Sequence, residues 1–256
     1  MTRAIKKIDE NDGTMQALQE RPDFLPIIPK SEAAGSENVS HQDLEIPRIG
    51  IIQDLSPQRK KTDPAYISGA EEGMMFNTVT GELYQEALLV IPVYFRKEWV
   101  LWVDRKAGGG FRGAFPNLGA AEAARSDVND PCESVETAQN FSLISSDGGA
   151  SWSEAVLSMS KSGLSVSRKW NSMIMLKEAD RFGQVYLVNP TQKTNSSGSF
   201  YVFNIQWHGW AKREWYDAGK ASYEMIKEGI KNVAMDEYSG DSDTDSDQSD
   251  EMSPGF

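Results

Sequence analysis

Short runs of β-forming residues, separated by turn signals, dominate the hydrophobic pattern of this chain. The first run covers residues 46–52 and ends at Ser56 and Pro57. Residues 88–103 are rich in Val, Leu, Ile, Trp, Tyr and Phe, a composition typical of paired strands, and the charged residues 96–98 predict a turn between two of them. Three later runs are also predicted to be strands: 154–159, 183–188 and 199–207.

The segments between these runs are predicted to be turns and loops. Residues 77–81 begin with Asn and end with Gly, which is typical of a tight turn. Residues 116–150 are rich in Ala, Ser, Asp and Gly. They predict an insertion or long loop, with a short helix at 119–125 and an apolar run at 141–144. Residues 190–198 are polar and predict a loop between two strands.

Two longer helices are predicted from apolar or shared-face residues that recur every three or four positions. The first covers 164–175 and rests on four residues at helix spacing: Leu164, Arg168, Asn171 and Met175. The second covers 217–235, and its apolar stripe consists of Tyr223, Ile226, Ile230 and Val233.

Together these elements predict a mainly β fold of the α+β class. The strands are short and follow one another with turns between them, which favours an antiparallel barrel or sandwich over alternating βαβ units. The predicted organisation is a flexible N-terminal arm at 1–45, a folded domain at 46–216, a C-terminal helix at 217–235 and a disordered acidic tail at 236–256.

Charge is concentrated at the two ends of the chain. The formal net charge is −12, and the segments 1–45 and 236–256 account for it, which leaves residues 46–235 balanced. A low isoelectric point therefore does not exclude a nucleic-acid-binding groove on the folded part, although it argues against a uniformly basic protein that coats duplex DNA.

Cysteine and histidine are too scarce for several kinds of site. Cys132 is the single cysteine, and His41 and His208 are the two histidines. A disulfide framework is thus excluded, a zinc site has few possible ligands, and neither a metal nor a cofactor is predicted. The composition fits a reduced, cytoplasmic compartment. We expect neither a secretory signal nor a membrane span, because no apolar run has the required length.

The last twenty residues are strongly acidic and end on an aromatic residue. They contain no Lys or Arg and offer little apolar surface to bury, so the sequence predicts a disordered tail. A tail of this kind is steered to basic surfaces, and its terminal ring and carboxylate can enter a basic pocket on a partner protein. The predicted partner-binding residues are Asp241, Asp243, Asp245, Asp247, Asp250, Glu251 and Phe256.

Aromatic and basic residues are interleaved in three segments, around 94–106, 168–170 and 207–216. Single-stranded nucleic acid needs this mixture, because its bases stack on rings and its phosphates pair with cations. Core packing is the alternative role for each ring. The candidate stacking residues are Trp99, Trp102, Phe111, Trp170, Tyr201, Phe203, Trp207 and Trp210. The candidate phosphate contacts are Arg96, Lys97, Arg105, Lys106, Arg112, Arg168, Lys169, Lys212 and Arg213.

Sequence patterns of known catalytic and metal sites occur only in fragments. Residues 158–161 match Ser-x-x-Lys, but the companion motifs of that enzyme class are missing. The glycines at 108–110 are not followed by the Gly-Lys-Ser/Thr of a phosphate-binding loop. The acidic tail imitates the start of a calcium loop, but Ser246 and Met252 replace the required Gly and Glu. No catalytic residues are predicted.

With these features in view, the chain resembles the single-stranded-DNA-binding proteins of podophage type. The resemblance lies in residues 46–57, 76–81, 90–102 and 165–171 and in the acidic tail that ends in Phe. It implies an oligonucleotide-binding (OB) barrel with insertions, DNA coating without sequence preference, and recruitment of replication and recombination proteins by the tail. The tip departs from bacterial relatives, because Met-Ser-Pro-Gly separates the last acid from Phe256.

The hypothesis from the sequence is therefore a non-enzymatic single-stranded-DNA-binding protein of a phage, in which the tail competes with DNA and recruits partners. Homo-oligomers are compatible with it. The alternative is a phage structural or assembly protein with an acidic solvating tail. A less favoured third class is a recombination mediator that binds DNA only in a complex.

Overall fold

The computed structural model describes residues 34–35, 47–104, 107, 110–126, 131–196 and 198–227. All of these except Ala34 and Gly35 belong to the unit formed by residues 41–256. Most of the predicted arm at 1–45, the end of the predicted C-terminal helix and the whole tail at 236–256 lie outside the described residues.

The described part of the chain is mostly β-structure. Its strands are β1 (Ile49–Ile51), β2 (Met75–Asn77), β3 (Leu83–Tyr84), β4 (Leu88–Val103), β5 (Phe111–Phe115), β6 (Cys132–Ser145), β7 (Ser153–Ser160), β8 (Gln184–Asn195) and β9 (Gly198–Trp210). Its α-helices are α1 (Leu118–Ser126), α2 (Leu164–Met175) and α3 (Arg213–Lys227). Short 3-10 helices are η3 (Pro57–Arg59), η5 (Lys161–Gly163) and η6 (Arg181–Gly183).

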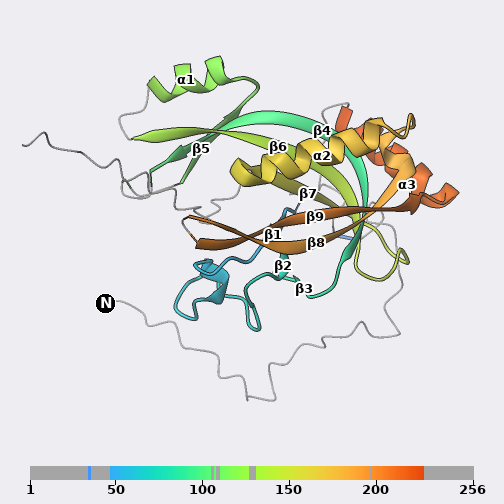
Figure 1. The fold of residues 1–256 in the computed structure, drawn as a ribbon, viewed down its shortest axis with the longest axis horizontal. Coiled ribbons are helices and arrows are strands. Elements are labelled where there is room, and N and C mark those ends of the chain that lie inside the picture. The colour runs from blue at the N-terminus through green and yellow to red at the C-terminus, as the bar shows by residue number, and fades with distance from the viewer. Residues whose placement is uncertain are drawn as a thin grey trace, which may run out of the picture. The chain divides into compact units, whose positions relative to one another are not determined.

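The strands form two antiparallel sheets (Figure 1). The large sheet has the order β7-β6-β4-β8-β9, and β5 pairs with the far end of β4. The small sheet has the order β1-β2-β3. The turn between β2 and β3 forms where residues 77–81 predict it, because Asn77 Oδ1 accepts hydrogen bonds from the amides of Val79 and Thr80. The mainly β, α+β fold predicted from the sequence is confirmed.

The predicted barrel, by contrast, does not close. β8 pairs with only the first three residues of β4, whereas β6 pairs with β4 along almost its full length. A bulge between Pro92 and Tyr94 interrupts the pairing with β6, and β4 and β6 curve strongly (Figure 1). The outer strands β7 and β9 do not pair with each other in the described part of the chain. Side chains of α2 pack between them, so the two strands stay further apart than the roughly 4.8 Å of a ladder.

The segment 47–53, which contains β1, connects the two outer strands β7 and β9 instead. The carbonyl oxygen of Pro47 accepts a hydrogen bond from the amide of Val156 on β7 at 2.8 Å. At the other end, the Gln53 side chain bonds to both backbone groups of Tyr201 on β9, at 2.8 and 2.7 Å. Free strand edges are sites of unwanted pairing, and these contacts cover part of both edges of the large sheet.

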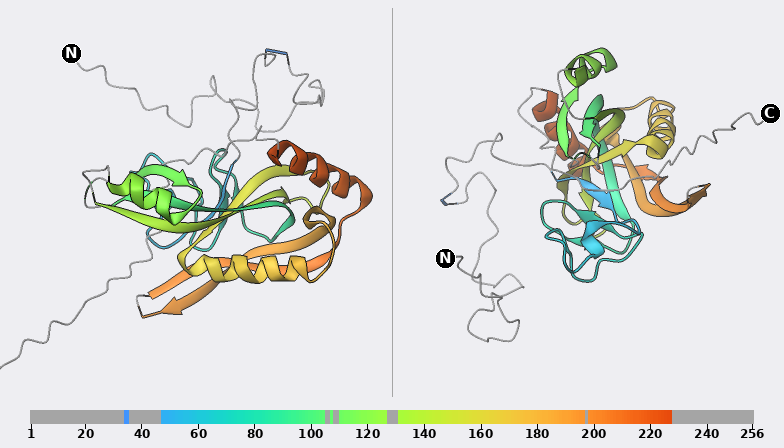
Figure 2. Two further views of the ribbon diagram at one scale, coloured as in Figure 1. Left: turned by 90° about the horizontal axis from the view of Figure 1, so that it is seen from above. Right: turned by 90° about the vertical axis from the view of Figure 1, so that its left-hand side faces the viewer.

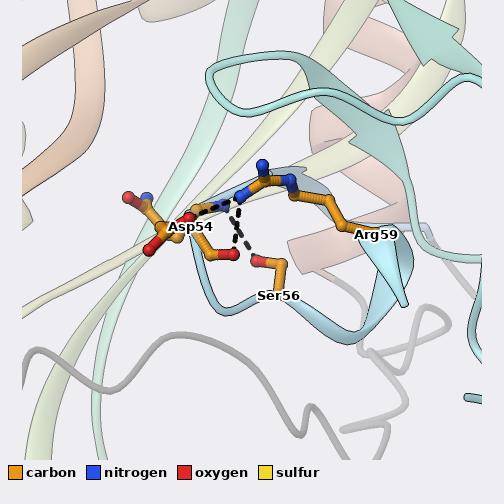
Figure 3. Close-up of polar contacts among 4 residues, drawn as sticks. Asp54, Ser56 and Arg59 are labelled. Carbon is orange, nitrogen blue, oxygen red and sulfur yellow. Dashed lines mark hydrogen bonds and ion pairs between the residues drawn. The ribbon is translucent and has the colours of Figure 1, made fainter.

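A tight turn after β1 holds Gln53 in place (Figure 3). Ser56 Oγ accepts a hydrogen bond from the Gln53 amide at 2.8 Å. The guanidinium of Arg59 donates to the backbone oxygen of Asp54 at 2.6 Å and to its carboxylate at 2.8 Å. The turn therefore positions the Gln53 amide group that pairs with β9.

The large sheet is covered on both faces, with α2 on one face and α3 on the other (Figure 2). On the first face, Trp170 and Ile174 of α2 pack with Tyr186, Val188 and residues of the small sheet. On the second face, the core around Ile91, Phe182 and Val185 packs against Trp215, Tyr216 and Tyr223 of α3. Burial on both faces explains why the first six residues of β4 are all buried.

Three sequence-based predictions about strands are wrong in the same way. Residues 96–98 are not a turn, because β4 continues through them in register with β6. Residues 132–145 form one long strand rather than part of a loop, since β6 bonds to β4 on one side and β7 on the other. Residues 190–195 belong to β8, which pairs with β9 up to Asn195 and Gly198. In each case, long-range hydrogen bonds override a polar local composition.

The helices lie close to their predicted places. α1 covers the short helix predicted at 119–125, α2 matches 164–175, and α3 begins four residues before the predicted start. The predicted face of α2 is wrong, however. Its buried residues are Ser167, Trp170 and Ile174, whereas Met175 is 73% exposed. None of the helices in the described ranges combines the length and the apolar character needed to cross a bilayer.

We predict that Gly219→Ala destabilises the protein although the substitution raises helix propensity. Gly219 is buried in α3, and a Cβ atom there would lie 2.7 Å from Cβ of Phe182. The clash should lower the free energy of unfolding by about 1–3 kcal/mol, measured by urea denaturation. Gly119→Ala in α1 is the control, because its Cβ would contact only the Asn117 side chain at 3.4 Å. A Gly219→Ala protein as stable as wild type would contradict this packing.

Candidate functional site

The exposed face of α2 carries cations near its beginning and apolar side chains at its end. Arg168 and Lys169 are exposed in the first half of the helix. Met175 and Leu176 are 73% and 82% exposed at the end, and exposed Lys177 follows them. A helix of this length extends roughly 18 Å. Arg168 and Met175 are seven residues apart, so the two kinds of surface are separated by roughly 10 Å, about two turns of the helix.

A carboxylate and three other side chains gather near the beginning of α2. The carboxylate of Glu136 on β6 accepts Lys97 Nζ of β4 at 2.7 Å, and Arg168 Nη2 of α2 lies 4.0 Å from the same oxygen. Trp99 of β4 is the direct cross-strand partner of Glu136, so both side chains lie on the same face of the sheet. A partly buried indole and two cations thus lie around one partly buried acid.

A group of aromatic rings lies near the end of α2. Trp207 and Trp210 of β9 pack edge to face, with ring centroids 5.2 Å apart. Lys177 Nζ lies 4.1 Å from the centroid of the Trp207 ring, at cation–π distance, and Tyr186 packs against that ring as well. Trp207 is therefore enclosed, while Trp210 remains 57% exposed.

Hydrogen bonding ties these rings to the helix. Gln184, the cross-strand partner of Trp210, donates from its side chain to the carbonyl oxygen of Ile174 at 3.2 Å. We call the combined surface the α2 track. It consists of Lys97, Trp99, Glu136, Arg168, Lys169, Met175, Leu176, Lys177, Trp207 and Trp210.

Six of the residues predicted from the sequence lie on the α2 track. They come from three segments that are far apart in the sequence, and α2 brings them to one side: Lys97, Trp99, Arg168, Lys169, Trp207 and Trp210. This surface offers a partly buried indole (Trp99) beside Lys97 and Arg168 near the beginning of α2, and an exposed indole (Trp210) beside the Trp207–Lys177 pair near its end.

Other predicted stacking residues belong to the core. Trp170 is fully buried and Phe203 is 7% exposed, so neither offers a free ring face to a base, and their predicted roles are corrected. Tyr201 is only partly buried, but its ring packs over Gly73 and against the core. These three rings stabilise the contact between the sheet, α2 and the small sheet.

The remaining predicted residues lie away from the α2 track or outside the described residues. Arg96 pairs with Glu98 at 2.5 Å and lies over Phe141, in a cluster that packs against Ile226 of α3. Trp102 packs against Phe111 where β4 meets β5, and Arg112 is exposed on β5. Lys212 lies over the Trp215 ring, and Arg213 pairs with Asp217 of α3 at 2.8 Å. Arg105, Lys106 and the tail lie outside the described residues.

Sequence reasoning missed four residues of the α2 track: Glu136, Met175, Leu176 and Lys177. Glu136 lies in a segment that was interpreted as a loop, so no pattern connected it to Lys97 or Arg168. Met175 and Leu176 did carry a usable signal. Ile174, Met175 and Leu176 are three consecutive apolar residues that together span more than half of the helix circumference, so they cannot all face the core, and here Met175 and Leu176 are exposed.

Comparison with known proteins identifies a family for this chain. The family model described as Pam3 phage gp34-like protein matches residues 12–232. That range includes all of the described strands and helices and the whole α2 track. No curated protein and no solved structure matches the chain.

Proposed function

The chain belongs to the Pam3 phage gp34-like family, and we propose that it is a phage protein that binds single-stranded DNA through the α2 track. Its role would be binding rather than catalysis, in replication or recombination in the host cytoplasm. The observation that carries the proposal is the convergence of one exposed indole, Trp210, two partly buried indoles and four cations from separate segments around α2.

The two ends of the α2 track suit two parts of a nucleotide. Trp210 is exposed and held edge to face against Trp207, so a base can stack on it with little loss of side-chain freedom. Base stacking on an aromatic ring is worth about 1–3 kcal/mol. Arg168 and Lys169 are exposed on α2, and Arg168 lies beside Glu136, the cross-strand neighbour of Trp99, so both cations are available to the phosphates that join stacked bases. A duplex hides its base faces, so unpaired strands are favoured.

Binding without sequence preference also fits these side chains. Sequence is read mainly by polar side chains that reach base edges in a groove. The α2 track instead presents indoles, aliphatic chains and flexible cations, which contact faces and phosphates that all nucleotides share.

The acidic tail would act on the same surface. Its carboxylates imitate the charge of a strand backbone, and Glu136 already shows that a carboxylate is accepted between Lys97 and Arg168. We infer that the tail competes with DNA for the α2 track and, once displaced, recruits replication or recombination proteins.

A phage structural or assembly protein is the second candidate. Exposed Met175 and Leu176 support it, because aliphatic side chains beside an indole suit a protein partner as well as a base. The experiments below separate the two roles, since an assembly protein should not discriminate poly(dT) from duplex DNA.

The first test is quenching of tryptophan fluorescence. Poly(dT) should quench the wild-type protein strongly and duplex DNA should quench it weakly. Trp210→Ala should weaken poly(dT) binding by roughly tenfold or more. The control is Trp102→Ala, because Trp102 lies away from the α2 track against Phe111. Equal losses in both variants, or no binding by wild type, would refute the proposed site.

The second test concerns Glu136. Glu136→Gln removes the acid that neutralises Lys97 and Arg168, so binding to an oligo(dT) should tighten by about threefold to tenfold at low salt. The matched control is Glu122→Gln on α1, which removes the partner of Arg125 instead. Affinity should be unchanged there. Weaker binding of Glu136→Gln would mean that the acid positions the cations productively.

The third test is truncation after Met235. If the tail competes with DNA, the truncated protein should bind oligo(dT) more tightly, and its affinity should depend more steeply on low salt. A chain of full length with Asn and Gln in place of the tail's acids should behave like the truncated protein. Identical binding by intact and truncated proteins across salt concentrations would exclude the competition.

A further inference from the structure

Arg181, in the short helix after α2, is a cation without a counter-ion among the described residues. Its Nη1 donates to Oδ1 of Asn171 on α2 at 2.9 Å. Its Nε and Nη2 are buried and find no hydrogen-bond partner in the part of the chain that the structure describes. The neighbouring carboxylate of Asp180 does not compensate it, because that group accepts a hydrogen bond from the hydroxyl of Tyr216 on α3.

This arrangement is unfavourable for the protein by itself. A buried charge normally has a partner, since water no longer solvates it. Burial lowers the pKa of Arg181 to about 10, which still leaves the guanidinium charged at neutral pH. An arginine fork with two unused donors is the geometry that binds phosphate or carboxylate in a bidentate manner.

The surroundings of Arg181 place this fork beside the α2 track. The guanidinium carbon lies 5.7 Å from the centroid of the Phe95 ring on β4, two residues before Lys97. Asn171 lies between Arg168 and Met175, at three and four residues along α2, so these side chains are neighbours on the helix. Arg181 and Asn171 are each partly exposed, and the unused donors therefore lie just below the surface.

We propose that the Arg181 guanidinium is a receptor for a phosphate oxyanion, which binds between Phe95 and Asn171 and contacts Nε and Nη2. Rotation of the Asn171 side chain opens these donors to the entering anion. The phosphate group is the chemistry that the site recognises. Its source is either the backbone of a strand on the α2 track or free phosphate, and only the first source rests on the function proposed above.

The first experiment uses the whole protein and inorganic phosphate. At equal ionic strength, phosphate should raise the Tm of wild type above that in chloride, on the order of 3 °C at concentrations well above Kd. Arg181→Met should show no phosphate-specific rise. Its Tm in chloride should equal or exceed that of wild type, because an uncompensated buried cation is replaced by an apolar chain.

Two further variants keep this test decisive. Asn171→Ala removes the hydrogen-bond acceptor of Arg181 Nη1 but keeps the cation, so its rise in phosphate should be at least as large as that of wild type. Arg125→Met is the control, because Arg125 is exposed on α1 and already paired with Glu122, and its response should match that of wild type. If phosphate has no specific effect on wild type, or if Arg181→Met keeps the full rise, the receptor does not exist.

The second experiment identifies the source of the phosphate. The slope of log affinity for oligo(dT) against log salt should fall by about 0.7 in Arg181→Met for each phosphate contact that is lost. If Arg181→Met leaves this slope unchanged but loses the phosphate-specific rise in Tm, the site binds free phosphate. If wild type does not bind oligo(dT) at all, the proposed function fails, while the Tm measurement still decides the existence of the receptor.

Discussion

The buried indole of Trp170 fixes the position of α2, and the candidate site depends on that position. Trp170 has no exposed surface and packs edge to face on Tyr186 of β8, with ring centroids 5.7 Å apart. Tyr186 contacts Trp207, and Trp207 contacts Trp210. One row of aromatic contacts therefore connects the centre of the core to an exposed ring. Truncating a buried indole typically costs about 3–5 kcal/mol, so α2 and the exposed ring are held by a strong constraint.

The curvature of the large sheet is the second condition for this site. β4 separates from β8 after three paired residues and bends at its bulge, while β6 follows it. The space on the inner side is filled by α2 and the small sheet. Because α2 lies across strands that diverge, its two ends meet different segments: Arg168 pairs with Glu136 of β6, and the Ile174 carbonyl accepts a hydrogen bond from Gln184 of β8. A flat sheet would not bring Trp99 and Trp210 to the two ends of one helix.

The positive charges around α2 are only partly neutralised by carboxylates. Glu136 contacts Lys97 and Arg168, while Lys177 lies on a ring and Arg181 has a single neutral partner. The folded body has balanced charge in the sequence, yet five of its cations lie on or beside α2: Lys97, Arg168, Lys169, Lys177 and Arg181. At these residues, an incoming polyanion would replace contacts with a ring or a neutral amide by stronger, charge-assisted hydrogen bonds. This explains why a chain with a net charge of −12 can still present a surface suited to phosphates.

The sequence by itself determined the class of fold, the position of α2 and the residue types available for binding. Those features depend on local periodicity and composition, which can be read without knowing which segments pair or pack together. Trp207 and Trp210, for example, could be proposed as binding residues from their spacing among basic residues. Tertiary structure decided which rings are free. Trp170 and Trp210 look alike in sequence, but strand pairing and helix packing bury the first and expose the second. It also decided that residues 96–98 and 132–145 are strands, because hydrogen bonds between segments far apart in the chain outweigh local preferences.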